Sequence, residues 1–160
     1  MRLTTFTDYT LRVLIHLAAR PSERTTIGEV ARTFQISEHH LAKVVHFLGA
    51  AGWVENTRGR GGGMQLAVPA SEINVGEVVK LTEGSDVPAE CFDPQSRDCV
   101  IFSRCRLKGI LAEGLRSFYA TLGEYTLEDL VHPREEIVKL LFTPAARPRE
   151  DLKESASSKP

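Results

Sequence analysis

Residues 53–67 read WVENTRGRGGGMQLA, and this stretch decides which fold the sequence predicts. Its ends, residues 53–56 and 64–67, have the composition of short β-strands, and a glycine-rich turn joins them. The turn carries Arg58 and Arg60 among glycines that let the backbone approach a phosphate or enter a narrow groove. A hairpin with such a basic tip is typical of the wing of a winged helix-turn-helix; a solvated loop is the alternative.

The segment before the hairpin is expected to form three helices. Thr7 or Asp8 caps the first, which ends near Arg20 and carries its apolar residues on one stripe. Thr26 and Glu29 have the spacing of a capping box, and they open a short second helix. The third helix follows the second closely, which favours a compact helical unit.

The third helix is expected between a cap at Ser37 and about Ala50, after a tight connection at residues 34–36. Its inner face is apolar, and its outer face consists of Glu38, His39, His40, Lys43 and His46. Two short helices with a three-residue turn and a polar face on the second describe a helix-turn-helix. The corner of any small α-helical domain would look similar, and the hairpin that follows decides between the two interpretations.

Beyond the hairpin, Asn74 is expected to cap a fourth helix over residues 75–83, with Glu77 as its capping-box partner. Residues 84–105 are expected to form a loop, and residues 106–122 the longest helix. Its apolar stripe consists of Leu107, Ile110, Leu111, Leu115, Phe118 and Leu122. This stripe is longer than one small domain covers, so it favours pairing with a second subunit. Packing on the chain's own first helix is the alternative.

The remaining segments complete the predicted organisation. Thr126 caps a last short helix, and a further apolar turn follows at residues 137–142. The predicted fold is mainly α with a small β-hairpin wing. Four units are expected: a DNA-binding winged helix-turn-helix (1–83), a cysteine loop (84–105), a dimerisation helix with C-terminal helices (106–142) and a disordered tail (143–160).

Charge and apolar patterning limit the class of protein. The chain has 160 residues and a net charge of −1, but residues 1–70 contain eight Lys and Arg against five Asp and Glu. Residues 71–160 contain twelve against sixteen, so the positive end can face phosphate while the acidic end points away. No apolar run approaches the roughly 20 residues of a membrane helix, and the N-terminus lacks the apolar core of a signal peptide. We therefore expect a cytoplasmic protein without a membrane partner.

All three cysteines, Cys91, Cys99 and Cys105, fall within one short segment. An odd count in a cytoplasmic chain does not suggest a disulfide framework. Structural zinc sites usually begin with cysteines about two to four residues apart, whereas this wider spacing suits thiolates that converge on an iron–sulfur cluster. A zinc site and a bare thiol switch remain open alternatives, and three thiolates leave one position for another ligand.

An enzymatic role finds little support in the sequence. There is no nucleotide-binding glycine motif, no plausible nucleophile–base pair and no second cysteine motif of an electron carrier. Among the histidines, His16 lies on the first helix and His132 beyond the long helix, so neither is well placed to complete a metal site. The pattern therefore favours a regulator over a metalloenzyme.

Three separated motifs carry a resemblance to a known family. These are LTTFTDYTLRVLIHLA at residues 3–18, TRGRGGGMQLAVPASEINVGEVV at residues 57–79 and CRLKGIL at residues 105–111. Together they resemble the nitric-oxide-sensing NsrR repressors, which belong to the winged-helix family that includes the iron–sulfur regulator IscR. The similarity runs from Met1 to about Leu141. It implies a homodimer that binds palindromic DNA, represses nitric-oxide detoxification genes and carries a [4Fe-4S] cluster; a [2Fe-2S] cluster is the alternative.

The resemblance also implies a ligand set for that cluster. It assigns three ligands to Cys91, Cys99 and Cys105, and a fourth to Asp8 of the FTDY motif, reaching across from the partner subunit. IscR-type relatives use a histidine three residues after the last cysteine, where this chain has Lys108. The seven residues between the first two cysteines exceed the family's usual spacing. An acid that stabilises the dipole of its helix is the alternative role of Asp8.

For DNA, the resemblance implies a third helix in the major groove and a wing arginine in the minor groove. The matching candidates are His39, His40, Lys43 and Arg58, with Arg12 and Arg60 as weaker candidates that touch phosphate. Reaction with nitric oxide is then expected to release Asp8 and lower operator affinity. A regulator that senses iron–sulfur status or redox state through zinc, [2Fe-2S] or thiol chemistry is the alternative.

Overall fold

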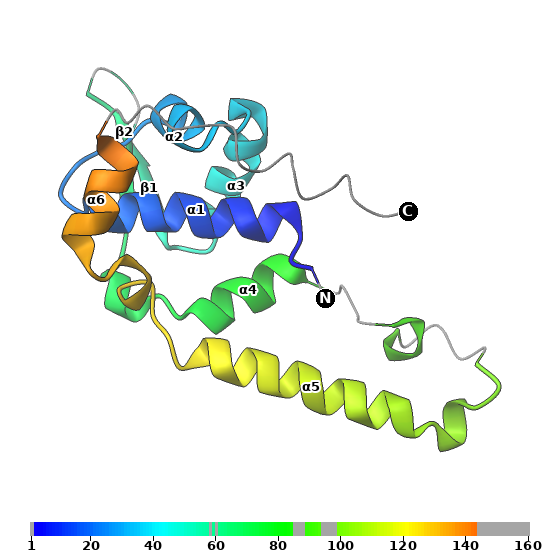
Figure 1. Ribbon diagram of the computed structural model, residues 1–160. Coiled ribbons are helices and arrows are strands. Elements are labelled where there is room, and N and C mark those ends of the chain that lie inside the picture. Colours follow the sequence, from blue (N-terminus) through cyan, green and yellow to red (C-terminus); the bar gives the residue numbers. More distant parts are fainter. Residues whose placement is uncertain (1, 58, 60, 85–88, 94–98, 144–160) are drawn as a thin grey trace, which may run out of the picture.

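The computed structural model describes residues 2–57, 59, 61–84, 89–93 and 99–143 (Figure 1). Its α-helices are α1 (Thr5–Ala19), α2 (Ile27–Phe34), α3 (Glu38–Ala50), α4 (Val75–Glu83), α5 (Arg106–Gly123) and α6 (Arg134–Phe142). The strands β1 (Val54–Thr57) and β2 (Gly63–Leu66) form one hairpin. Short 3-10 helices are η1 (Ala70–Glu72), η2 (Glu90–Phe92), η3 (Phe102–Arg104) and η4 (Asp129–Val131). Within the described ranges, no helix is long and apolar enough to cross a membrane. The predicted fold class, mainly α with a β-hairpin wing, is confirmed.

Helix α1 begins earlier than its sequence predicts. The N-cap is Thr4, whose hydroxyl oxygen accepts a hydrogen bond of 3.2 Å from the backbone N–H of Thr7. The cap expected at Thr7 or Asp8 is therefore wrong. Thr7 is instead fully buried within the first turn, where its hydroxyl donates to the Glu83 carboxylate at the end of α4. This partner lies far away in sequence, so only the folded chain reveals why Thr7 does not cap the helix.

The helix-turn-helix follows its local sequence signals closely. Thr26 and Glu29 form the predicted reciprocal capping box at the start of α2. Helix α2 ends at Gln35, whose φ of 56° lies in the left-handed region and turns the chain sharply. Ser37 occupies the N-cap position of α3 but its side chain accepts no capping hydrogen bond.

The hairpin is anchored to the connection between α1 and α2. Val54 pairs with Leu66 and Thr57 with Gly63 in antiparallel register, so each strand lies within one residue of its predicted position. Near the turn of the hairpin, Thr25 and Met64 exchange two backbone hydrogen bonds, of 3.0 and 2.8 Å. Because both groups of the Thr25 backbone are used, the wing cannot swing freely relative to the helices.

The hydrophobic core surrounds α1, which lies between the other helices of the winged-helix unit (Figure 1). Fully buried side chains come from every part of this unit and include Val13, Leu14, Leu17, Val30, Leu41, Val44, Leu48, Ile73 and Val78. Leu127 and Val131, from the segment after α5, belong to the same core. The chain therefore leaves the winged-helix unit after α4, and the segment that follows α5 returns to complete the core of that unit.

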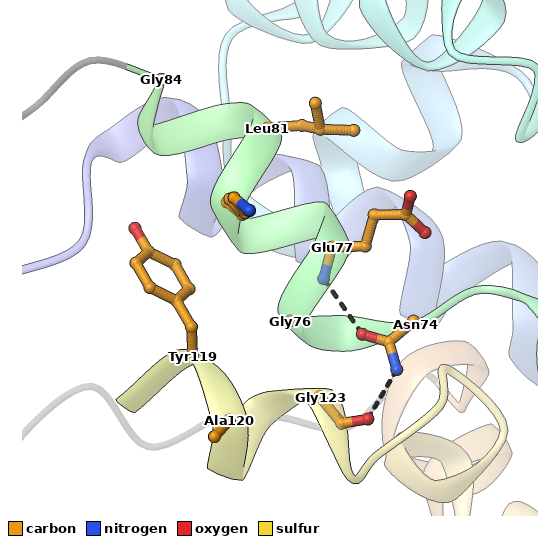
Figure 2. Close-up of a pocket in the computed structure, with 9 residues that line it drawn as sticks. Asn74, Gly76, Glu77, Leu81, Gly84, Tyr119, Ala120 and Gly123 are labelled. Atoms are coloured by element: carbon orange, nitrogen blue, oxygen red, sulfur yellow. Dashed lines mark hydrogen bonds between the residues drawn. The ribbon is translucent and has the colours of Figure 1, made fainter. Parts of the chain in front are cut away.

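Helix α5 packs on α4 at a close crossing (Figure 2). A Cβ atom on Gly76 would lie 2.7 Å from the backbone nitrogen of Gly123, so glycine is required for the two helices to approach this closely. Asn74 holds the crossing from one side: its Oδ1 accepts from Glu77 N–H at 3.1 Å and its Nδ2 donates to Gly123 C=O at 2.7 Å. Asn74 is therefore the N-cap of α4, as predicted. The expected capping-box partner was the Glu77 side chain, but the Asn74 side chain binds Gly123 of α5 in its place.

No residue of α5 is fully buried by the rest of the described chain. Leu107 and Ile110 are each 60% exposed, and the helix lies along α4, so packing on α1 is not what places it (Figure 1). Beside the crossing, an open groove of about 850 Å³ runs between α4 and α5, and Leu81 at its edge is also exposed. The N-terminal part of the apolar stripe, Leu107 and Ile110, thus lacks a cover within the described residues, whereas its other members are half-buried.

We predict that Gly76→Ala destabilises the fold by about 1–3 kcal/mol, because the added methyl group must push α4 and α5 apart. Gly109→Ala is the matched control, since a Cβ on this glycine of α5 meets no atom within 4 Å. That variant should gain about 0.5–1 kcal/mol from the lower entropy of alanine in a helix. Urea unfolding of both variants measures the difference, and equal effects at the two positions would contradict the close crossing.

Candidate functional site

The outer face of α3 carries the side chains predicted to read DNA. His39, His40 and Lys43 are exposed. On the opposite face, Leu41, Val44, Val45 and Leu48 are buried. The helix is held from inside by apolar packing, so its polar face is free to enter a groove.

His40 and Lys43 also border a small pocket between α3 and the start of α1. This pocket has a volume of about 190 Å³ and is lined by Thr5, Phe6, Tyr9, His40, Lys43 and Val44. The rings of His40 and Tyr9 lie 6.3 Å apart. The candidate DNA-reading residues therefore lie against the helical turn that carries the FTDY motif and Asp8.

The wing arginines Arg58 and Arg60 lie outside the described residues. Between and beside them, Gly59 and Gly61 have φ angles of 98° and 78°, a conformation that L side chains rarely adopt. The N–H of Gly62 donates to the Gly59 carbonyl at 2.9 Å and tightens this turn. The turn of the predicted wing thus needs glycines, because its backbone takes φ angles that other residues rarely adopt.

Arg24 is an exposed basic residue that the sequence pattern did not single out. Its guanidinium donates a hydrogen bond to the Thr57 hydroxyl and lies 3.8 Å from the Glu55 carboxylate. These contacts place the Arg24 charge beside β1, near the end of the strand that leads into the wing turn. No local signal could reveal this position, because it depends on the pairing of Thr25 with Met64.

Asp8 and Arg12, predicted separately as a metal ligand and a phosphate contact, form one ion pair on α1. Two bonds join them: Arg12 Nη2 lies 2.8 Å from Asp8 Oδ2, and Arg12 Nε donates to Asp8 Oδ1 at 3.0 Å. The Asp8 side chain is 45% exposed and the Arg12 side chain is 41% exposed. An exposed pair of this kind contributes about 0–1 kcal/mol, so Asp8 can exchange Arg12 for another cation at little cost.

The three cysteines are free thiols at the boundaries of short elements. Cys91 lies in η2, Cys99 precedes η3, and Cys105 is the N-cap of α5. Cys91 and Cys105 are half-buried, whereas Cys99 is exposed. Among the described residues, no group of three His, Cys, Asp or Glu side chains is close enough to hold a metal ion.

The Glu83 carboxylate joins the end of α4 to the beginning of α1. Glu83 Oε1 accepts hydrogen bonds from Thr4 N–H at 2.8 Å, from the Thr4 hydroxyl at 3.1 Å and from the Thr7 hydroxyl. Burial raises the pKa of Glu83, but the hydrogen bonds from Thr7 and Thr4 outweigh it and hold the pKa below its usual value. Glu83 is the last residue of α4, one residue before the predicted cysteine loop, so this network links that loop to the helix that bears Asp8.

The histidines that the sequence ranked low as ligands have distinct environments. His16 is buried against Phe34 and Phe142, with ring centroids 6.0 and 4.7 Å away. Burial lowers its pKa to about 4, so it is neutral near pH 7. His132 is exposed after η4.

A winged helix whose wing follows directly on an exposed helix defines a class of transcription regulators. The family model described as "Iron-dependent Transcriptional regulator" matches residues 3–133. The chain therefore belongs to the Rrf2 family, and it is a transcriptional regulator and not an enzyme.

Known relatives agree with this assignment. The HTH-type transcriptional regulator NsrR of Bacillus subtilis (strain 168) is 51% identical over 142 residues, covering 88% of this chain and 97% of the relative. The oxidised form of Staphylococcus aureus CymR has a TM-score of 0.65 and 27% identity, covering 82% of this chain and 97% of CymR. IscR of T. potens has a TM-score of 0.67 over 85% of this chain and 90% of its own, and at 24% identity it supports the fold alone.

We predict that Glu83→Gln lowers stability at neutral pH and makes it less dependent on pH in the acidic range. A carboxyl whose folded pKa is depressed stabilises the fold above its unfolded pKa of about 4.5, and this contribution is lost as pH falls through the folded pKa. The wild-type chain should therefore lose stability below about pH 4.5 more steeply than the variant does.

Glu77 is an exposed residue of the same helix, so Glu77→Gln provides the control for the removal of one negative charge from α4. Thermal unfolding between about pH 3 and 7 compares the three proteins. Parallel stability curves for wild type and Glu83→Gln would rule out a stabilising role for the Glu83 carboxylate.

Proposed function

We propose that this chain is a DNA-binding transcriptional repressor whose operator affinity is controlled by a nitric-oxide-sensitive [4Fe-4S] cluster. The observation that carries the proposal is the segment of three free thiols directly before α5, in a chain of the Rrf2 family. The family model's description as iron-dependent and the 51% identity to a regulator named NsrR support an iron-based sensor for nitrosative-stress genes.

The donor set fits an iron–sulfur cluster. Cys91, Cys99 and Cys105 offer three thiolates, the ligands that hold such clusters. Cys105 lies at the N-terminus of α5, where the helix dipole favours a negatively charged group. Bound there, the cluster would supply an iron site with an exchangeable fourth ligand that reacts with nitric oxide.

Asp8 of the partner subunit is the proposed fourth ligand. Its carboxylate is partly exposed and its present partner, Arg12, forms only a surface ion pair with it. Arg12, one turn further along α1, would therefore be the partner of Asp8 whenever the carboxylate holds no iron. Because Tyr9 and His40 line one pocket, a shift of this turn would reach the face of α3 that reads DNA.

The DNA complex follows from the winged helix. We propose that His39, His40 and Lys43 contact bases in the major groove, that Arg58 enters the minor groove, and that Arg60 and Arg12 contact phosphate. The apolar stripe of α5, of which Leu107 and Ile110 are exposed, is proposed to pair with α5 of a second copy, which would give a homodimer suited to a palindromic operator.

A second candidate keeps the DNA-binding function but senses redox state or iron–sulfur status through thiol, zinc or [2Fe-2S] chemistry. The exposed free thiol of Cys99 favours it, because an accessible cysteine can be oxidised directly. Iron and sulfide analysis distinguishes this candidate from the [4Fe-4S] sensor.

We predict that the full chain purified without oxygen contains iron and acid-labile sulfide, absorbs visible light and binds a palindromic operator. Nitric oxide should abolish this binding, because the cluster-loaded and reacted states are expected to differ in affinity. The measurement is operator binding by fluorescence anisotropy before and after nitric oxide. Equal affinity of the cluster-free and the cluster-loaded protein would refute the proposed sensor.

Asp8→Ala tests the fourth ligand through the visible spectrum, lifetime and nitric-oxide reactivity of the cluster. It should change cluster lifetime and nitric-oxide reactivity more than it changes thermal stability, because only a surface ion pair is lost from the fold. Arg12→Ala removes the same ion pair without removing the carboxylate and is the matched control. Identical cluster spectra and reactivity in wild type and Asp8→Ala would leave Asp8 as an acid that only stabilises its helix.

For DNA, we predict that Arg58→Ala weakens operator binding by about tenfold, the order of magnitude of one charge-assisted contact. It should also relax the preference for A·T pairs near the half-site edges, where a narrow minor groove attracts arginine. Lys139→Ala, which removes an exposed positive charge from α6, is the control. An unchanged footprint at those edges would contradict the wing assignment.

A further inference from the structure

Two phenylalanines flank the cysteines on short 3-10 helices. Phe92 follows Cys91 in η2, and Phe102 begins η3 between Cys99 and Cys105. Local backbone hydrogen bonds shape both turns: Phe92 N–H donates to Ala89 at 3.0 Å, and Phe102 N–H donates to Cys99 at 2.9 Å. Phe92 is thus the sequence neighbour of Cys91, and Phe102 is hydrogen-bonded to the backbone of Cys99.

Lys108, in the first turn of α5, reaches both of these rings. Its Nζ lies 4.1 Å from the centroid of the Phe102 ring and 5.9 Å from that of Phe92. Both distances lie within the roughly 6 Å over which a cation is attracted to an aromatic face. The three side chains are half-buried, whereas Val100 and Ile101, on the same segment, are 98% and 62% exposed. Lys108, Phe92 and Phe102 thus form a small packed cluster, here called the lysine clamp.

The charge at this end of α5 is unusual for a helix N-terminus. The first turn contains Arg106 and Lys108 and no acidic residue, and Arg104 lies just before it. Cations are disfavoured there by the positive end of the helix dipole, so their presence points to a neighbouring anion that offsets their repulsion. Thiolates, and a cluster that they hold, are anions of this kind.

We propose that Lys108 is a positioning residue for the cysteine site. Its ammonium group holds Phe92 and Phe102 together, and with them the backbone that carries Cys91 and Cys99, before any group binds. Its charge then stabilises the anionic thiolate site. The nature of the bound group rests on the proposed function, whereas the clamp itself is a property of the unloaded chain.

Lys108→Gln, which keeps a good helix former but removes the charge, tests the clamp in the cluster-free full chain. Hydrogen–deuterium exchange at residues 89–93 and 102–106 should become about two- to fivefold faster, the shift that corresponds to one cation–π contact. Lys108→Arg should restore slow exchange, because its guanidinium also packs on aromatic rings. Lys139→Gln, on α6 at the far end of the molecule, should leave these segments unchanged (Figure 1). Wild-type exchange rates in Lys108→Gln would overturn the clamp.

A second measurement tests the charge in protein prepared without oxygen. Lys108→Gln should lose iron several-fold faster than wild type and have a lower cluster reduction potential, because a cation stabilises the more negative reduced state. Lys108→Arg retains the charge and should keep the wild-type potential. A residue that acted only by packing would not lower the potential when its charge is removed in Lys108→Gln. An unchanged potential in Lys108→Gln would refute the electrostatic role. Wild-type protein without iron and sulfide would instead refute the proposed function, and hydrogen–deuterium exchange would still decide the clamp.

Discussion

The close crossing of α4 and α5 at Gly76 and Gly123 sets the geometry on which the candidate sensor depends. Residues next to this crossing belong to the winged-helix core, since Ile73 and Val78 flank Gly76 in sequence and Leu127 follows Gly123. The long helix is therefore held firmly at its C-terminal end, while its N-terminal end carries Cys105 away from the core (Figure 1). A small displacement at the cysteines would then move the N-terminal end of α5 relative to its fixed C-terminal end.

A second set of contacts runs from the end of α4, next to the cysteine segment, to the candidate DNA-reading face of α3. Glu83 binds Thr4 and Thr7 at the start of α1, and the next turn carries Asp8 beside Arg12. The same part of α1 borders His40 on α3 through Tyr9. The Glu83 hydrogen bonds and the Asp8–Arg12 ion pair are polar, and Tyr9 meets His40 through its ring. All of these contacts lie outside the apolar core, so a change in the partner of Asp8 could shift them without unfolding it. In the proposed function, this arrangement would link a ligand at the cysteines to affinity for DNA.

Local signals predicted most of the fold because they act over a few residues. The capping box of Thr26 and Glu29, the helix boundary at Ser37 and the hairpin were all placed within a residue or two. The errors arose where a distant residue competes with the local one. Thr7 donates to Glu83 and leaves the cap to Thr4, and Asn74 turns its amide to Gly123. For the candidate site, motifs supplied the residues, but their ligand roles remain predictions.

The amino-acid sequence by itself determined the winged helix-turn-helix, because periodicity, caps and glycine turns are encoded within each element. It also identified the cysteines, Asp8 and the basic wing as the chemically distinctive residues. Only the tertiary structure decided that Arg24 contacts β1 of the wing and that Lys108 lies near two phenylalanines of the cysteine segment. Those relations depend on distances between side chains of separate turns and elements, which the spacing of residues along the chain does not specify.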